Sequence, residues 1–334
     1  MSTHVTTRIV LVERPTSTPE EHHFRVESEP VAELADGQAR VKPIALSIDA
    51  FIRTALNEGS FHRSVPIGGL VSALGVGLVE ESRSESIATG DHVFGPLGAQ
   101  TVAVVPGAAL MPIQTNDFPA ATFLGALGMS TGVTAYCGMA MIGEPQPGQT
   151  VVVSAAAGAV GSIAAQVAKL AGANVIGIAG GPHKQAFLLD DLGLAGAIDY
   201  KNEDVAERLS ELAPDGVNVF FDNVGNPILD LVLDHIAERS RVVICGAVAQ
   251  YGNMQNIAGP SLYLRLAERH SRMEGFTVMH FADRWDEATK QLSSWLRNGD
   301  LIMRETVVDG IEQFPEAIAM LFNGGHVGKL LLTP

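Results

Sequence analysis

Apolar and polar residues alternate in short runs over about the first 120 residues, and glycines interrupt these runs. Residues 39–53 form a run rich in β-formers, and glycines follow it within residues 66–69, 75–77 and 90–95. Glycine at this density among alternating apolar residues is typical of short, strongly curved strands. The pattern predicts a small β-barrel for this part of the chain.

From about residue 122 onward, short apolar strands alternate with helical segments. We predict a strand at residues 150–155, an alanine-rich helix at 159–171 and a second strand at 174–180. Four more strands are predicted at residues 197–200, 217–222, 241–246 and 275–281. Six strands with helices between most of them predict an α/β fold with a doubly wound parallel sheet.

The end of the chain resembles a strand, a helix and a strand that return to the first domain. We therefore expect residues 1–123 to form the first part of the barrel domain and residues 124–300 to form the sheet domain. Residues 301–334 then complete the barrel domain.

Composition narrows the classes of partner and the compartment. The chain has 37 acidic and only 22 basic residues, a net charge of −15, which disfavours nucleic acids and anionic membrane surfaces. We find no secretory signal at the start and no apolar run of the roughly 18 residues that a membrane span needs. Cys137 and Cys245 are the only cysteines, so we expect no disulfide framework and a cytoplasmic protein.

The sequence Ala156-x-Gly158-x-x-Gly161 stands directly after a predicted strand and at the opening of a helix. Gly158 would let the backbone approach a pyrophosphate, Gly161 would let helix and strand pack closely, and the helix start favours negative charge. Ala156 replaces the first glycine of the usual fingerprint, and a tight turn without a ligand is the alternative. The surrounding βαβ unit favours dinucleotide binding.

The second strand decides between the two nicotinamide cofactors. In sites for NAD, an Asp or Glu near the end of this strand binds the ribose 2′-hydroxyl. Residues 179–184 contain no acidic residue and end in Lys184. A lysine can neutralise a 2′-phosphate that an acid would repel. We therefore predict NADP(H), with a solvated lysine on a first helical turn as the alternative.

Metal ligands are missing where a zinc dehydrogenase needs them. Neither cysteine lies near residues 46–52, and the ten histidines show no H-x-x-x-H or H-E-x-x-H spacing. We predict a metal-free protein.

Four segments resemble one family: residues 128–136 (GMSTGVTAY), 155–162 (AAAGAVGS), 221–225 (FDNVG) and 244–247 (ICGA). They are similar to the zinc-independent medium-chain dehydrogenases/reductases, in particular the leukotriene 12-hydroxydehydrogenase/prostaglandin reductase group. The resemblance extends from residue 47 to residue 332. It implies a Rossmann domain beside a GroES-like barrel domain, a homodimer, and NADPH-dependent reduction of the C=C bond in small apolar enals or enones.

The resemblance also implies roles for single residues. Lys184 and Tyr200 would hold the 2′-phosphate, Asn223 would lie beside the cofactor ribose, and Gly246 would approach the nicotinamide half. Tyr200 closing a strand and Asn223 capping a helix are the alternatives. The expected cofactor-binding residues are Met129, Thr134, Gly158, Ala159, Val160, Gly161, Lys184, Tyr200, Asn223, Cys245 and Gly246.

Tyr251 is the expected catalytic residue. Hydride addition to the β-carbon of an enone leaves negative charge on the carbonyl oxygen, and a neutral phenol can donate a hydrogen bond to it. A loop tyrosine that only packs is the alternative for Tyr251. A quinone reductase of the same fold and a non-catalytic NADPH-binding protein remain alternative functions.

Two residues depart from the family pattern: Phe51 stands where a tyrosine is usual, and His326 stands where an asparagine is common. Both changes predict an altered substrate pocket. Asp49 and Arg53, four residues apart, are expected to form an ion pair. Cys137 and Cys245 are expected to be unreactive packing residues, Cys245 inside a buried strand.

Overall fold

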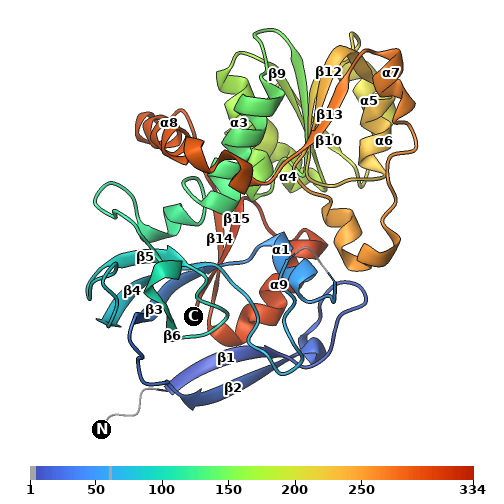
Figure 1. Cartoon of the computed structure of the whole chain (residues 1–334). Coiled ribbons are helices and arrows are strands. Elements are labelled where there is room, and N and C mark those ends of the chain that lie inside the picture. Colours follow the sequence, from blue (N-terminus) through green and yellow to red (C-terminus); the bar gives the residue numbers. More distant parts are fainter. Residues whose placement is uncertain (1–4, 60–61) are drawn as a thin grey trace. The chain divides into compact units, whose positions relative to one another are not determined.

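The computed structural model describes residues 5–59 and 62–334, and the chain folds as two compact units (Figure 1). Unit 1 comprises Met1–Gly125, Gly252–Met254 and Glu305–Pro334, and unit 2 comprises Ala126–Tyr251 and Gln255–Arg304. No helix in the described parts of the chain is both long and apolar enough to cross a bilayer.

Unit 2 is built on a six-stranded parallel sheet. Its strand order is β10 (Gly196–Asp199), β9 (Asn174–Ala179), β8 (Thr150–Ser154), β11 (Val217–Asp222), β12 (Ile236–Ile244) and β13 (Arg272–Gly275). The chain passes outward from β8 through β9 and β10, then returns to the middle and passes outward through β11, β12 and β13. The predicted doubly wound Rossmann sheet is confirmed, and its switch point lies between β8 and β11, where such sheets bind ligands.

Helices cover both faces of this sheet. Figure 1 shows α5 (Val205–Leu212), α6 (Ile228–Leu233) and α7 (Leu264–Glu268) on one side and α3 (Ala159–Leu170) on the other. Val152 and Phe220 point into the apolar core under the first group. Phe221, the next residue along β11, contacts the opposite side, because a Cβ on Gly138 would lie 2.7 Å from its ring. Successive residues therefore face opposite layers, as a buried parallel strand requires.

The remaining helical segments of unit 2 are short except for one. They are η4 (Met129–Val133), α2 (Thr134–Tyr136), η5 (Cys137–Gly143), α4 (Pro182–Ala186), η6 (Phe187–Asp191), η7 (Val248–Asn256, which crosses the boundary between the units), η8 (Val278–Arg284) and the longer α8 (Trp285–Asn298).

The sixth strand is not where the apolar pattern predicted it. Residues 275–281 were expected to pair, but the strand is Arg272–Gly275, and Val278–Arg284 forms a 3₁₀ helix. Thr277 is the N-cap of that helix. Its side chain accepts a hydrogen bond from the backbone of His280, and the side chain of His280 accepts one from the backbone of Thr277. Trp285 Nε1 then donates to Val278 O at 3.0 Å. Local capping therefore overrides an apolar run that, by composition, suits a strand equally well.

Unit 1 contains the strand-rich domain. An antiparallel pair, β1 (Val5–Leu11) and β2 (Phe24–Pro30), accompanies a seven-stranded sheet. The order of this sheet is β14 (Glu305–Asp309), β15 (Lys329–Thr333), β3 (Gln38–Ser47), β4 (Gly75–Ser82), β5 (His92–Gly95) and β7 (Met111–Pro112), with β6 (Ala103–Pro106) paired to β3. The end of the chain supplies β14, α9 (Phe314–Asn323) and β15, and β15 pairs antiparallel with β3. Short 3₁₀ helices are η1 (Glu21–His23), η2 (Gly107–Ala109), η3 (Ala120–Phe123) and η9 (Ile311–Gln313).

Close approach of strands explains one of the glycines that marked this domain. A Cβ on Gly77 in β4 would lie 2.5 Å from Val41 Cγ1 and 2.6 Å from Lys42 O in β3. These distances are shorter than atoms tolerate, so only glycine fits where the pairing of β3 and β4 changes register.

The β-rich prediction for residues 39–53 is correct only in its first part. Strand β3 ends at Ser47, and α1 (Ala50–Ala55) carries Phe51 and Arg53. Asp49 stands before that helix with an extended backbone. Residues 52–55 of α1 are all buried, and a run of this length does not distinguish a short buried helix from a strand.

Candidate functional site

The loop between β8 and α3 carries the glycine motif. Ala155, directly after β8, has a positive φ of 48°, and Gly158 precedes α3 with an extended backbone. Ala156 N–H donates to Ile178 O of β9 at 3.0 Å, which fixes the loop to the neighbouring strand. The chain therefore turns sharply at the switch point and enters a twelve-residue helix.

Gly161 is the tightest point of this turn. A Cβ there would lie 2.3 Å from Ala155 O, so a side chain would push α3 away from β8. Gly158, Ala159 and Val160 stay half-buried in front of it, at the helix end whose first N–H groups have no intrahelical acceptor. This geometry suits a backbone cradle for a phosphate group.

The turn after β9 carries the predicted cation. Lys184 is half-buried on α4, and Tyr200 follows β10, the next strand of the sheet. Tyr200 lies over this turn, because a Cβ on Gly180 would approach its Cε1 to 2.8 Å. Burial, and after it repulsion from Lys201, lower the pKa of Lys184. Lys184 and Lys201 are therefore neighbours beside this turn.

Asp199, at the end of β10, is used to hold the same turn. Its carboxylate accepts hydrogen bonds from the N–H groups of Gly181 at 2.7 Å and Lys201 at 3.0 Å, and from Asn202 Nδ2 at 2.7 Å. Burial alone would raise the pKa of Asp199, but these hydrogen bonds lower it overall. The acid thus shapes the loop after β9 from the neighbouring strand.

Asn223 is fixed at the switch point by a buried network. Ser154 Oγ at the end of β8 donates to Asp222 Oδ1 at the end of β11, at 2.8 Å. Asn223 donates its backbone N–H to Ser154 Oγ at 2.8 Å and its Nδ2 to Ser154 O at 2.7 Å. Burial raises the pKa of Asp222 although its neighbours' N–H groups donate to it. The network joins the two central strands and sets the side chain of Asn223.

The loop after β12 brings Gly246 and Tyr251 next to Asn223. Gly246 N–H donates to Asp222 O at 3.1 Å, and Ala247 N–H donates to Tyr251 Oη at 3.3 Å. A Cβ on Gly246 would lie 3.0 Å from Tyr251 Oη and 3.5 Å from Asn223 O. Burial raises the pKa of Tyr251, so its phenol keeps its proton at neutral pH.

Cys245 is not inside a strand as predicted. Strand β12 ends at Ile244, and Cys245 follows it half-buried, with its N–H donating to Asp222 O at 2.9 Å. Its position is thus beside Gly246. Burial raises the pKa of the Cys245 thiol to about 12 and that of the fully buried Cys137 to about 11, so both sulfurs stay protonated and unreactive.

Met129 and Thr134 share one helical turn of unit 2. Thr134 Oγ1 donates to Met129 O at 2.7 Å, and both residues are half-buried. Their segments, η4 and α2, pack against α3, the helix that begins at the glycine loop.

The predicted ion pair between Asp49 and Arg53 in unit 1 is wrong. Asp49 pairs instead with Lys329 Nζ at 2.6 Å, and both charged groups are largely buried. Arg53, also buried, donates to the carbonyl groups of Pro15 at 2.8 Å and Ser17 at 2.9 Å. A spacing of four residues suggested that the two side chains would pair. Each of them instead binds a residue from a distant segment of the chain.

The two residues that depart from the family pattern also lie in unit 1. The ring of Phe51 lies 5.3 Å from the ring of His62, whose Nδ1 is 2.6 Å from Thr54 Oγ1. His326 is buried just before β15. Phe51 therefore offers an aromatic face and no hydroxyl.

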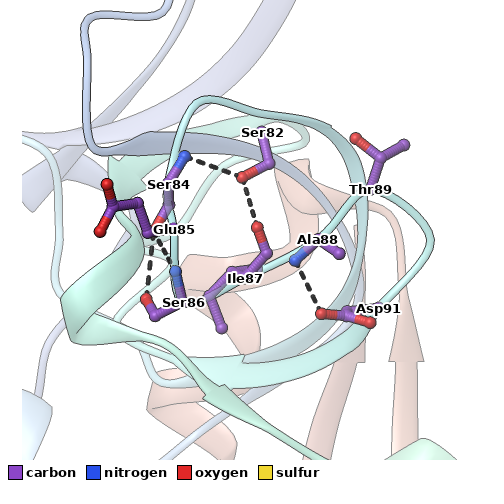
Figure 2. Close-up of a pocket in the computed structure, with 8 residues that line it drawn as sticks. All are labelled: Ser82, Ser84, Glu85, Ser86, Ile87, Ala88, Thr89 and Asp91. Atoms are coloured by element: carbon purple, nitrogen blue, oxygen red, sulfur yellow. Dashed lines mark hydrogen bonds between the residues drawn. The ribbon is translucent and has the colours of Figure 1, made fainter.

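Unit 1 also has a pocket of about 290 Å³ in the loop after β4, shown in Figure 2. Its polar groups bond one another: Ser82 Oγ donates to Ile87 O at 2.6 Å, and Ala88 N–H donates to Asp91 Oδ2 at 2.8 Å. No predicted site residue lines it. Most of the predicted site residues lie instead at or near the strand ends of unit 2.

Three residues of this site did not appear among the predicted ones: Asp199, Lys201 and Asp222. Each stands at or directly after the end of an apolar strand predicted from the sequence, and the carboxyl ends of parallel strands share one edge. That position could have identified Asp199 and Asp222, whereas the place of Lys201 over Gly180 depends on how β9 and β10 pair.

Two family models match the chain: "N-terminal domain of oxidoreductase" over residues 7–113 and "Zinc-binding dehydrogenase" over residues 159–294. The Bacillus subtilis protein YfmJ is 41% identical over 331 residues, which cover 97% of this chain and 96% of that protein. The 2-alkenal reductase (NADP(+)-dependent) of Nicotiana tabacum is 34% identical over 293 residues, covering 86% and 85% of the two chains.

Among solved structures, the chain is similar to CurA from Vibrio vulnificus in complex with NADPH. The sequences are 32% identical, 98% of each chain is covered, and the TM-score is 0.92.

Proposed function

This chain belongs to the alkenal and prostaglandin reductase group of the medium-chain dehydrogenase/reductase family, and we propose that it is an NADPH-dependent reductase of the C=C bond in α,β-unsaturated aldehydes or ketones. The observation that supports this most is the edge where β8, β9, β11 and β12 end. It combines a tight glycine turn at the start of α3, a lysine after β9 where β9 itself ends without an acid, and a protonated phenol.

The residues of this edge fit NADP(H). The half-buried backbone at Gly158 and the start of α3 would receive the pyrophosphate, and Lys184 with Tyr200 would receive the 2′-phosphate. Asn223, which follows β11 at the switch point, would lie beside the cofactor ribose, and Gly246 next to it would approach the nicotinamide half. We place Ala159, Val160, Met129, Thr134 and Cys245 in the same binding region. When bound, NADPH supplies the hydride for the β-carbon of the substrate.

Tyr251 is the proposed catalytic residue. Reduction of the β-carbon moves negative charge onto the carbonyl oxygen of the substrate, where a donor stabilises it. Ala247 N–H donates to the Tyr251 oxygen at 3.3 Å, which helps to orient the phenol at this edge. Burial keeps that proton in place at neutral pH.

A substrate panel tests the proposal. Enals, enones and quinones are supplied with NADPH, its oxidation is followed, and the products are identified. We expect saturated aldehydes and ketones from enals and enones. Hydroquinones as the only products would establish a quinone reductase instead, and no turnover of any compound would leave a non-catalytic binding protein.

We expect activity without a metal. Among the residues that the structure describes, no three His, Cys, Asp or Glu side chains come together as a metal site. Elemental analysis should find zinc well below one ion per chain, and treatment with chelators should leave activity unchanged. Stoichiometric zinc whose removal abolishes turnover would contradict this expectation.

A homodimer is the expected assembly. Within the described residues, strand β13 pairs only with β12, so its outer edge carries unpaired backbone groups, and Met273 in it is 36% exposed. Antiparallel pairing about Met273 would place Arg272 opposite Glu274 of the partner subunit, a favourable cross-strand pair.

Light scattering should therefore give twice the chain mass of 35.2 kDa. Met273→Glu should shift the protein toward monomer, whereas the same change at Met111, exposed on unit 1, should not. A wild-type monomer at micromolar concentration would rule out the dimer.

The cytoplasm is the proposed compartment. Both cysteines of the chain are free thiols, as is usual for proteins that work in a reducing environment.

A further inference from the structure

The turn after β9 carries two lysines, and only Lys184 was expected to meet the cofactor. Lys201 follows Tyr200 at the end of β10. A Cβ on Gly180 would lie 2.9 Å from Lys201 Cε and 2.8 Å from Tyr200 Cε1. The stem of Lys201 therefore lies across this turn beside the tyrosine ring instead of extending away from the surface.

The absent side chain of Gly180 makes this placement possible. A side chain at Gly180 would force the tyrosine ring and the lysine stem to shift away from the turn. Gly181, next along the chain, has a φ of 97°, which also favours glycine. The two glycines thus leave an open turn over which a tyrosine and a lysine from the neighbouring strand can lie.

The two lysines of this turn interact electrostatically with each other, and Lys201 also interacts with Asp199. Repulsion from Lys201 contributes to the lowered pKa of Lys184, so the charges sense each other. Neither lysine has a carboxylate oxygen within 4.0 Å in the described part of the chain, although acidic residues outnumber basic ones overall. Like charges repel, and an anion placed between them relieves that repulsion.

The nearby acids are directed at other partners. Asp199 accepts hydrogen bonds from the backbone N–H groups of Gly181 and Lys201, and these bonds fix the turn. Glu203 accepts from Gln185 Nε2 at 2.7 Å and pairs with Arg208 at 3.2 Å. Both carboxylates thereby stabilise the loop, and their hydrogen bonds are made to groups other than the two ammonium groups.

We propose that Lys201 is a second cation for the 2′-phosphate of NADP(H) and, together with Lys184, determines the preference for NADP(H) over NAD(H). This inference rests on the cofactor proposed above and adds a residue to its binding site. Two cations are expected to bind a phosphate of charge near −2 better than one, because each offers a separate charge-assisted hydrogen bond.

Calorimetry with NADP⁺ and NAD⁺ tests the proposal without any substrate. The ratio of the Kd for NAD⁺ to the Kd for NADP⁺ isolates the contribution of the 2′-phosphate to binding. Lys201→Met should reduce this ratio about tenfold, the loss of one charged contact, and Lys201→Arg should keep most of it. The Kd for NAD⁺ should stay near the wild-type value in both variants.

Lys290→Met is the matched control, since Lys290 is exposed on α8 and its loss changes the net charge equally. It should leave both Kd values unchanged. A Lys201→Met protein with the wild-type ratio and melting temperature would overturn the role of Lys201. Equal binding of NADP⁺ and NAD⁺ by the wild type would instead reject the cofactor assignment itself.

Discussion

Lys184→Ala should raise the Kd for NADPH about ten- to a hundredfold and leave the Kd for NADH nearly unchanged. Lys184 is half-buried beside the turn at Gly180, so water screens its ammonium group less than it screens a fully exposed one. NADH has no 2′-phosphate and therefore loses no contact. Fluorescence or calorimetric titration of both cofactors measures the effect.

The expected loss is larger than for Lys201 because Lys184 is the less exposed of the two cations. Screening by water weakens interactions of exposed charges. Lys290→Ala is the control for net charge, and it should bind both cofactors like the wild type. Equal loss of NADPH and NADH affinity in Lys184→Ala would indicate a damaged fold, and unchanged NADPH affinity would remove Lys184 from the site.

The strands at the centre of unit 2 could be predicted from the sequence because their apolar runs are fully buried. Predicted strands at residues 150–155 and 217–222 match β8 and β11 to within one residue. The glycine loop between β8 and α3 was equally clear, since only glycine fits beside Ala155 O at position 161. Local pattern and tertiary packing agree at these places, which is why they were predictable.

Contacts between distant segments could not be predicted. The buried pair of Asp49 and Lys329 joins residues 280 positions apart, and no local spacing indicates it. The edge strand β13 was misplaced because a capped 3₁₀ helix occupies an apolar run. Lys201 was missed for a related reason: its place over Gly180 depends on how β9 and β10 pair, which the sequence around Lys201 does not contain.

The function of Tyr251 makes the most demanding prediction. Tyr251→Phe should lower kcat for an enone about ten- to a hundredfold while the Kd for NADPH stays near its wild-type value. Removing the principal donor to a developing oxyanion costs roughly 2.7 to 4 kcal/mol, and a smaller loss is expected here because the cofactor ribose can share the donation. Steady-state kinetics on several enones, with cofactor binding measured separately, resolves the two effects.

Phenylalanine keeps the ring that packs near Gly246 and removes only the oxygen that Ala247 N–H bonds, so the variant should fold. Tyr263→Phe is the matched control, since Tyr263 is 57% exposed, and its kcat should equal that of the wild type. Phe51 carries no hydroxyl, so the position where the family usually has a tyrosine cannot replace the lost donor. Wild-type kcat for Tyr251→Phe on every enone would leave catalysis to the cofactor's hydroxyl and to positioning of the substrate, which alone can supply large rate factors.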